Sequence, residues 1–181
     1  MSEVGAKIED LRFVGQIISP KDQSQEFEVL RGITDPLYEQ YKNYLAHDSS
    51  LSDFTNDTER FAQTVYEFAD RRAVYSLVGS SLICGIIWFG QKAGVPPDAP
   101  IDFAVRTCGI GRGNGLALPF MQTSIADFVR TSQTVVESIN LEVKTANIGA
   151  IALYEAFGFR PADIQDKPET LKMTYNPVAA G

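Results

Sequence analysis

The alternation of hydrophobic and polar residues predicts a chain of mixed strands and helices. A two-residue alternation is typical of half-buried strands, whereas apolar residues three and four positions apart are typical of amphipathic helices. By this criterion we expect strands at residues 28–34, 72–78, 82–89, 101–105, 141–145 and 171–175. Helices are expected at residues 37–46, after 57, after 118, and between 147 and 158. This order indicates a single α/β domain whose one sheet is covered by helices on both faces.

The first 25 residues are polar and irregular, except for a stretch at 11–18 that would suit an added strand at the sheet edge. We therefore divide the chain into an N-terminal extension, 1–25, and a domain, 26–181. A chain of 181 residues is long enough for one hydrophobic core and short for two.

The chain is acidic, with a formal net charge of −7. This charge disfavours nucleic acid, a polyanion, as a partner. It either attracts a cationic substrate or merely keeps the surface soluble, and the sequence leaves both interpretations open. No apolar run approaches the roughly 18–20 residues that cross a bilayer, so no membrane association is expected.

Side chains that bind metals or form covalent intermediates are few. Cys84 and Cys108 make neither a disulfide framework nor a zinc site, and the lone histidine, His47, excludes a multi-histidine metal site. We expect no metal. Free thiols and an N-terminus without secretory-signal features predict a cytoplasmic location. A covalent role for Cys108 would require an activating base that the sequence does not indicate, so we interpret this thiol as a buried spectator.

The most informative segment is rich in glycine, which occupies four of the seven positions from Gly109 to Gly115. Such a turn before a helix directs backbone N–H groups and the positive end of the helix dipole toward one point, which suits a phosphate. A flexible turn without a ligand is the alternative. A P-loop is excluded because Gly115 is followed by Leu116 rather than lysine, and no dinucleotide fingerprint of the form G-x-G-x-x-G/A fits.

A second segment combines a helix cap with aromatic residues. Asn147 is suited to cap a helix on which Tyr154 and Phe157 share an apolar face, and Gly158 is suited to end that helix. Each residue alone is explained by helix capping or core packing. The spacing between them carries the further information.

Together, the two segments resemble the signature of the GNAT superfamily of acyl-CoA-dependent N-acyltransferases. The first matches R-x-x-G-x-A at Arg112, Gly115 and Ala117, and the second matches N-x-x-A-x-x-L-Y-x-x-x-G-F over residues 147–159. The resemblance implies a mostly antiparallel mixed sheet of about seven strands, with helices on both faces and splayed fourth and fifth strands. It also implies transfer of an acetyl group from acetyl-CoA directly to a primary amine of a small molecule or a protein, and it allows a homodimer.

The resemblance further implies roles for individual residues. Asn147 would contact the pantetheine arm or its lead-in, and Val105 and Arg106 would border that arm at the end of the fourth strand. Tyr154 would act as the general acid that protonates the departing thiolate. The coenzyme A pyrophosphate would be held by the backbone amides of Arg112, Gly113, Asn114, Gly115, Leu116 and Ala117.

The base that would deprotonate the amine is less evident. Many GNAT proteins carry a glutamate on the fourth strand, and Asp102 is the nearest carboxylate in this sequence. Strand alternation places Asp102 opposite Phe103 and Val105, so it is either the catalytic base or a solvent-facing residue, and a water chain could replace it. The missing glutamate also supports an alternative function, a non-catalytic acyl-CoA-binding or sensor module.

The resemblance places the acceptor site at the first two helices and the loops at 47–57 and 161–170. The aromatic and acidic side chains in the first of these regions include Tyr38, Tyr41, Asp48, Asp53 and Asp57. These side chains would either form a cage for a cationic amine or serve as helix packing and a solvated loop. The sequence leaves the identity of the acceptor open.

Overall fold

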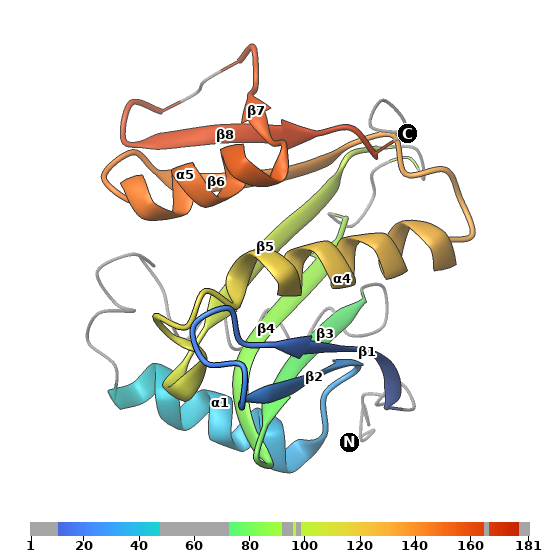
Figure 1. The fold of residues 1–181 in the computed structure, drawn as a ribbon. Helices are drawn as coiled ribbons and strands as arrows, with labels where there is room; N and C mark the ends of the chain where they lie inside the picture. Colours follow the sequence, from blue (N-terminus) through green and yellow to red (C-terminus); the bar gives the residue numbers. More distant parts are fainter. Residues whose placement is uncertain (1–10, 48–72, 92–95, 97–98, 165–166, 178–181) are drawn as a thin grey trace, which may run out of the picture.

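The computed structural model describes residues 11–47, 73–91, 96, 99–164 and 167–177 (Figure 1). Its helices are α1 (Asp35–His47), α4 (Ala117–Thr131) and α5 (Ile148–Phe157), and a 3-10 turn, η2 (Gly109–Gly111), precedes α4. Its strands are β1 (Arg12–Ile18), β2 (Glu26–Arg31), β3 (Val74–Gly79), β4 (Leu82–Gly90), β5 (Ile101–Thr107), β6 (Ile139–Lys144), β7 (Arg160–Pro161) and β8 (Thr170–Tyr175). The helix predicted after residue 57 lies outside the described residues. None of the described helices has the length and apolar character that a bilayer crossing requires.

The strands form one mixed sheet in the order β1-β2-β3-β4-β5-β6-β8-β7. Neighbouring strands are antiparallel, apart from the parallel pair β5–β6. The described residues contain eight strands, against the seven or so that were predicted. The additional strand is β7, whose two residues are too few to produce a periodic pattern in the sequence. The mostly antiparallel mixed sheet implied by the resemblance is confirmed.

The strands predicted at 72–78 and 82–89 are present as β3 and β4, which form a hairpin. Its turn consists of Ser80 and Ser81, which both have positive φ angles, 51° and 64°. Two consecutive positive φ angles are the geometry of a type I′ turn, whose twist matches that of the flanking strands. The turn therefore sets the pairing of β3 and β4 up to the irregularity between Leu77 and Val78.

β1 occupies one edge of the sheet and pairs with β2. A polar cluster links this edge to α4: the buried Asp127 carboxylate accepts hydrogen bonds from Arg12 at 2.6 Å, Tyr75 at 2.9 Å and Arg130 at 2.6 Å. The side chain of Ile17 from the same edge strand is buried in the main core. These contacts connect β1, β3 and α4. The boundary proposed between the extension, 1–25, and the domain, 26–181, stays a prediction.

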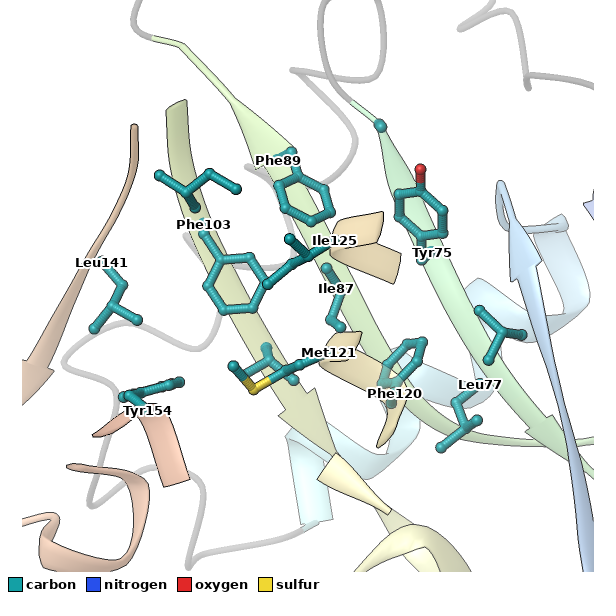
Figure 2. Packing of buried hydrophobic residues seen from close by; sticks show 14 of the residues in the cluster. Tyr75, Leu77, Ile87, Phe89, Phe103, Phe120, Met121, Ile125, Leu141 and Tyr154 are labelled. Atoms are coloured by element: carbon teal, nitrogen blue, oxygen red, sulfur yellow. The ribbon is translucent and has the colours of Figure 1, made fainter. Parts of the chain in front are cut away.

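Both faces of the sheet are covered by helices, as predicted. On one face, α4 and α5 enclose the main core (Figure 1), part of which is shown in Figure 2. Within this core the rings of Phe89 and Phe128 are stacked with centroids 4.1 Å apart. On the other face, α1 packs through Leu37, Tyr38 and Tyr41 against β3 and β4. Full burial of one such side chain contributes about 1.5–3 kcal/mol. The two cores hold the centre of the sheet from both sides and so fix the position of β5.

The parallel pair β5–β6 is short. Ile101 is paired with Ile139 and Asp102 with Asn140, and the pairing ends there. β6 continues as the antiparallel partner of β8 as far as Lys144. The predicted splay between the strands at 101–105 and 141–145 is thus confirmed.

Candidate active site

The divergence of β5 and β6 leaves a cavity of about 450 Å³, here called the first cavity. Its lining comes from β5, β6, α5 and the region around the glycine turn. The residues predicted for the site that line it are Val105, Arg106, Arg112, Ala117, Asn147 and Tyr154. The glycine turn and the Asn147–Tyr154 helix, which are separate in sequence, therefore contribute to one cavity.

The glycine turn adopts a conformation that requires glycine. Gly113 and Gly115 each have a φ angle of +71°, in the left-handed region that L side chains disfavour. A Cβ at Gly113 would meet no atom within 4 Å, and one at Gly115 would make only ordinary contact with Pro20. Backbone conformation, and not crowding, therefore accounts for both glycines.

This conformation leaves a row of backbone amides without an acceptor. The N–H groups from Gly113 to Ala117 donate no hydrogen bond to any residue that the structure describes. The first backbone bond of α4 runs from the Phe120 N–H to the Leu116 carbonyl at 3.0 Å. The preceding amides carry the positive end of the helix dipole, and Arg112 adds a positive charge beside them. The arrangement suits a phosphate.

The turn is anchored to the sheet on its other side. The Asn114 side-chain amide donates to the Ile110 carbonyl at 2.6 Å, and the Cys108 N–H donates to the Cys84 carbonyl at 2.9 Å. Gly111 lies so close to the same Cys84 carbonyl that a Cβ there would collide with it. These contacts preorganise the turn, and they leave the backbone amide of Asn114, rather than its side chain, for a ligand.

α5 begins and ends as its sequence predicted. The Asn147 Oδ1 accepts a hydrogen bond from the Ala150 N–H at 3.2 Å and so caps the helix. Gly158, with a φ angle of +122°, ends it, and the following Phe159 N–H donates to the Tyr154 carbonyl at 2.9 Å. Because the cap uses the oxygen of Asn147, the two Nδ2 hydrogens remain to serve a ligand in the first cavity.

Tyr154 is positioned by aromatic packing. Its side chain is 8% exposed, and its ring meets that of Phe159 edge-on with centroids 5.8 Å apart. Figure 2 shows Tyr154 beside Leu141, across from Phe103 and Met121. The phenol is therefore presented from α5 to the space between the diverging strands.

The environment of Tyr154 favours its protonated form. Burial raises the pKa of this phenol above its usual value, and the positive charge of Arg106 offsets only part of that effect. The phenol is thus protonated at neutral pH. A group that carries a proton at the working pH, beside a cation that stabilises its anion, can act as a general acid.

The β5 edge offers a backbone donor to the same cavity. The Ile101 N–H donates across to the Ser138 carbonyl at 3.0 Å, on the side of β6. Every second residue of a strand directs its N–H to the same edge, so the Val105 N–H also faces β6. Val105 lies beyond the last paired residue, Asp102, and its amide therefore faces the first cavity.

A second cavity, of about 420 Å³, lies where the other face of β5 and β6 is exposed. Asp102 lines this second cavity and not the first, in keeping with the alternation that separates it from Val105. The residues that line both cavities are Phe103, Ala104, Arg106, Leu141 and Glu142. The two cavities therefore adjoin each other at the splay.

Glu142 is the carboxylate, among the described residues, that lines both cavities, and the sequence interpretation did not select it. It is exposed and has no side-chain hydrogen bond or ion pair with another described residue. In the sequence it is only the polar position between Leu141 and Val143. One signal could have identified Glu142: it lies on the strand that the resemblance predicted to diverge from the strand at 101–105.

Other predicted residues lie elsewhere. Tyr38 and Tyr41 are 6% and 0% exposed in the α1 core, which supports helix packing rather than a cage. The three aspartates at 48, 53 and 57 are outside the described residues. Cys108 is fully buried, and it lines neither cavity.

No protein-family model matches the sequence, and no curated protein matches it. Solved structures do match the fold. RimL, a ribosomal L7/L12 alpha-N-protein acetyltransferase solved with coenzyme A, aligns over 91% of this chain and 98% of its own, with a TM-score of 0.69 and 10% identity. The spermidine N-acetyltransferase of Vibrio cholerae, solved with CoA and spermine, aligns over 84% of this chain and 96% of its own, with a TM-score of 0.63 and 12% identity. The GNAT domain of S. lividans PAT aligns over 90% of this chain and 96% of its own, with a TM-score of 0.65 and 15% identity.

These likenesses, with the short β5–β6 pair, show the fold. The chain has the GNAT N-acetyltransferase fold, as the resemblance of its two segments implied. At identities of 10–15% a shared fold leaves the reaction and the substrate to be argued from the site itself.

Proposed function

We propose that this chain is an acyltransferase that moves an acetyl group from acetyl-CoA to a primary amine. The observation that carries the proposal is the first cavity, whose lining runs from Arg112 and Ala117, the two residues that flank the acceptor-free amides of the glycine turn, to the buried Tyr154. A coenzyme A thioester has its phosphates at one end and its sulfur at the other, so it requires both features in one elongated site.

The donor would be bound mainly by backbone groups. The amides from Gly113 to Ala117, together with Arg112, hold the pyrophosphate, and the Asn147 Nδ2 group contacts the pantetheine arm. The arm lies along the unpaired edge of β5, where its amide groups replace the strand partner that β6 no longer supplies. The thioester carbonyl accepts a hydrogen bond from the Val105 N–H, which stabilises the developing oxyanion. RimL and the Vibrio cholerae acetyltransferase were themselves solved with coenzyme A.

The reaction is a direct transfer. The neutral amine nitrogen attacks the thioester carbonyl carbon, and an N–C bond forms. The C–S bond then breaks, and the Tyr154 phenol donates its proton to the departing thiolate. The amine loses one proton to a carboxylate, and exchange with water restores both groups. The products are an N-acetylated amine and free coenzyme A.

We assign the base to Glu142 in preference to Asp102. Glu142 lines both cavities, and this position supports a carboxylate close to the point where an amine entering from one side would meet a thioester bound on the other. Asp102 lines the second cavity alone, which suits it to hold or orient the ammonium group before its proton is removed. A base acts best within hydrogen-bond reach of the reacting nitrogen, directly or through one water.

A thiol-release assay with acetyl-CoA and a broad panel of amines tests the proposal, with calorimetry of acetyl-CoA binding in parallel. Turnover of any amine, with release of one thiol per N-acetyl product, supports it. The alternative function, a binding or sensor module, predicts tight acetyl-CoA binding with no transfer to any amine and no effect of Tyr154→Phe. If acetyl-CoA neither bound nor was turned over, both functions would be excluded.

A further inference from the structure

The connection between β1 and β2 lies against the glycine turn. Apart from the residues on either side of Gly115, the atoms nearest to a Cβ built there belong to the ring of Pro20, at 3.5 to 3.8 Å. Figure 1 shows this blue connection beside the yellow segment that leads into α4. From this placement we propose that Lys21, the residue after Pro20, binds the 3′-phosphate of the coenzyme A donor. The inference rests on the proposed function and deepens it, since it names a residue that selects the donor.

Contacts along α4 hold the hairpin of β1 and β2 in place. The Arg12 guanidinium contacts the Asp127 carboxylate at 2.6 Å, in the C-terminal half of α4. Further along β1, a Cβ at Gly15 would lie 3.3 Å from the Thr123 Cγ2. Pro20 continues this row of contacts to the glycine turn before α4. β1 therefore follows α4 toward its N-terminus, and the connection to β2 is held at the end where phosphates are expected.

The connection between β1 and β2 is also ordered by its own hydrogen bonds. Ser19 is 1% exposed, and its Oγ accepts hydrogen bonds from the N–H groups of Lys21 at 3.3 Å and Asp22 at 3.2 Å. The Ser19 N–H donates to the Gln25 carbonyl at 2.9 Å and closes the connection. The backbone of Lys21 is thus fixed and its N–H is already used. What Lys21 offers to a ligand is its side-chain ammonium.

The ammonium of Lys21 is available for an anion. The residue is exposed, and its side chain forms no hydrogen bond or ion pair with another described residue. The carboxylate of the neighbouring Asp22 accepts hydrogen bonds from the N–H and the hydroxyl of Ser24, at 3.0 and 2.7 Å. That carboxylate is therefore engaged within the connection and does not pair with Lys21. Lysine binds phosphate as a compact charge on a flexible stem, which suits such a position.

The position of Lys21 indicates which phosphate it binds. The lining of the first cavity reaches the glycine turn at Arg112 and Ala117, and it includes neither Pro20 nor Lys21. A donor whose arm fills this cavity, and whose pyrophosphate lies on the turn amides, has one further anionic group, the 3′-phosphate of its ribose. That group follows the pyrophosphate on the side away from the thioester, and it carries about −1.5 to −2 charges at neutral pH. Lys21, beside the turn and outside the cavity, is placed for this phosphate.

The inference also gives the predicted N-terminal extension, 1–25, a part in donor binding. Pro20 and Lys21 both belong to it. Pro20 places the connection against Gly115, and Lys21 supplies the charge. A donor that lacks the 3′-phosphate would leave this cation without a ligand, so the extension would favour phosphorylated coenzyme A.

Coenzyme A and dephospho-coenzyme A test the proposal, because they differ in the 3′-phosphate alone. The full chain is titrated calorimetrically with each ligand at about 0.1 M salt. We expect wild type to bind coenzyme A about fivefold more tightly, the upper size of effect for an exposed ion pair. At about 1 M salt, where the screening length falls to about 3 Å, this preference should largely disappear.

Three variants test the structural cause. Lys21→Met removes the charge: the affinity for coenzyme A should fall about fivefold while that for dephospho-coenzyme A stays unchanged. Lys21→Arg keeps the positive charge and should retain the preference for coenzyme A. Lys167→Met is the matched control, because this exposed lysine lines neither cavity and its loss changes the net charge equally, so the preference should persist. Thermal unfolding verifies that the variants are folded.

The outcomes separate this inference from the proposed function. A preference for coenzyme A that Lys21→Met abolishes, without turnover of any amine, supports the inference and counts against catalysis. Turnover of an amine, with equal affinities of wild type and Lys21→Met for coenzyme A, supports catalysis and overturns the inference. Equal losses of affinity for both ligands in Lys21→Met, an equal loss of preference in Lys167→Met, or no binding of either ligand to wild type overturns the inference as well.

Discussion

Asp102 of β5 is paired with Asn140 of β6, and it is the last residue of β5 that pairs with β6. The residues directly after this pair, Phe103 and Leu141, line both cavities. The pairing of β5 with β6 therefore ends, and the first cavity begins, at one bridge. Because the exposed β5 edge needs hydrogen-bond partners, a ligand with amide groups is the natural occupant of the space that follows.

Tyr154→Phe tests the proposed general acid. We expect kcat to fall by about 100-fold, because general acid catalysis typically contributes that much or more. The dissociation constant of coenzyme A should change little, since the ring is retained. Tyr175→Phe is the control, because Tyr175 belongs to the aromatic packing around α5 and lines neither cavity. Similar losses in the two variants would contradict the assignment.

Glu142→Gln and Asp102→Asn separate the two candidate bases. If Glu142 removes the amine proton, the Gln variant should lose about 100-fold in kcat. The Asn variant should instead raise KM for the amine, because Asp102 lines only the second cavity. Steady-state kinetics across pH measures both effects. If kcat of Glu142→Gln were normal, the base would instead be Asp102 or a water chain.

Gly115→Ala tests the conformation of the phosphate turn. A side chain at a φ angle of +71° costs about 1–2 kcal/mol, so coenzyme A should bind roughly tenfold more weakly if the turn relaxes. Gly149→Ala, at an exposed position of α5 where a Cβ meets no atom within 4 Å, is the matched control. Calorimetric dissociation constants compare the two. Equal affinities in both variants would mean that the turn does not hold the phosphates.

Asp127→Asn tests the buried polar cluster that connects β1 and α4. Burial raises the pKa of this carboxyl, but the Tyr75 and Arg12 hydrogen bonds and the charge of Arg12 outweigh burial, so the pKa lies below its usual value. We expect the free energy of unfolding to fall by about 1–3 kcal/mol at neutral pH, because a charged hydrogen-bond partner is lost. Urea unfolding of the variant and of wild type measures it, with the exposed Asp163→Asn as control.

The effect of Asp127→Asn on the free energy of unfolding should depend on pH. A carboxyl with a lowered pKa stabilises the fold above its unfolded value, near 3.8, and this contribution is lost as pH falls through the folded pKa. The difference between wild type and Asp127→Asn should therefore be constant at neutral pH and shrink below about pH 4. A difference that grew on acidification would be inconsistent with this account.

The sequence predicted the local geometry of the proposed donor half because its residues have strong local signals. Glycines at positive φ, an asparagine cap and an aromatic helix face are local features, and Gly115, Asn147 and Tyr154 therefore stand where their spacing indicated. The sheet and its splay followed from the resemblance of the two segments. Two-residue β7 was missed because so short a strand has no periodicity.

The acceptor half depends on contacts between strands that are distant in sequence. Glu142 and Lys172 become neighbours only through the antiparallel register of β6 and β8. In the sequence each is simply the polar position of an alternating strand, and such positions face solvent more often than a site. The position of Glu142 at both cavities arises from the divergence of β5, which no local pattern around residue 142 records.

The central claim is that the space between β5 and β6 binds acetyl-CoA and transfers its acetyl group to an amine. Mass spectrometry of the products formed from isotopically labelled acetyl-CoA tests it most directly, with wild type and Tyr154→Phe compared over the same panel of amines and amino acids. The account predicts a labelled N-acetyl product from wild type and about 100-fold less from the variant. No labelled product with any acceptor, or equal amounts from the two proteins, would contradict it.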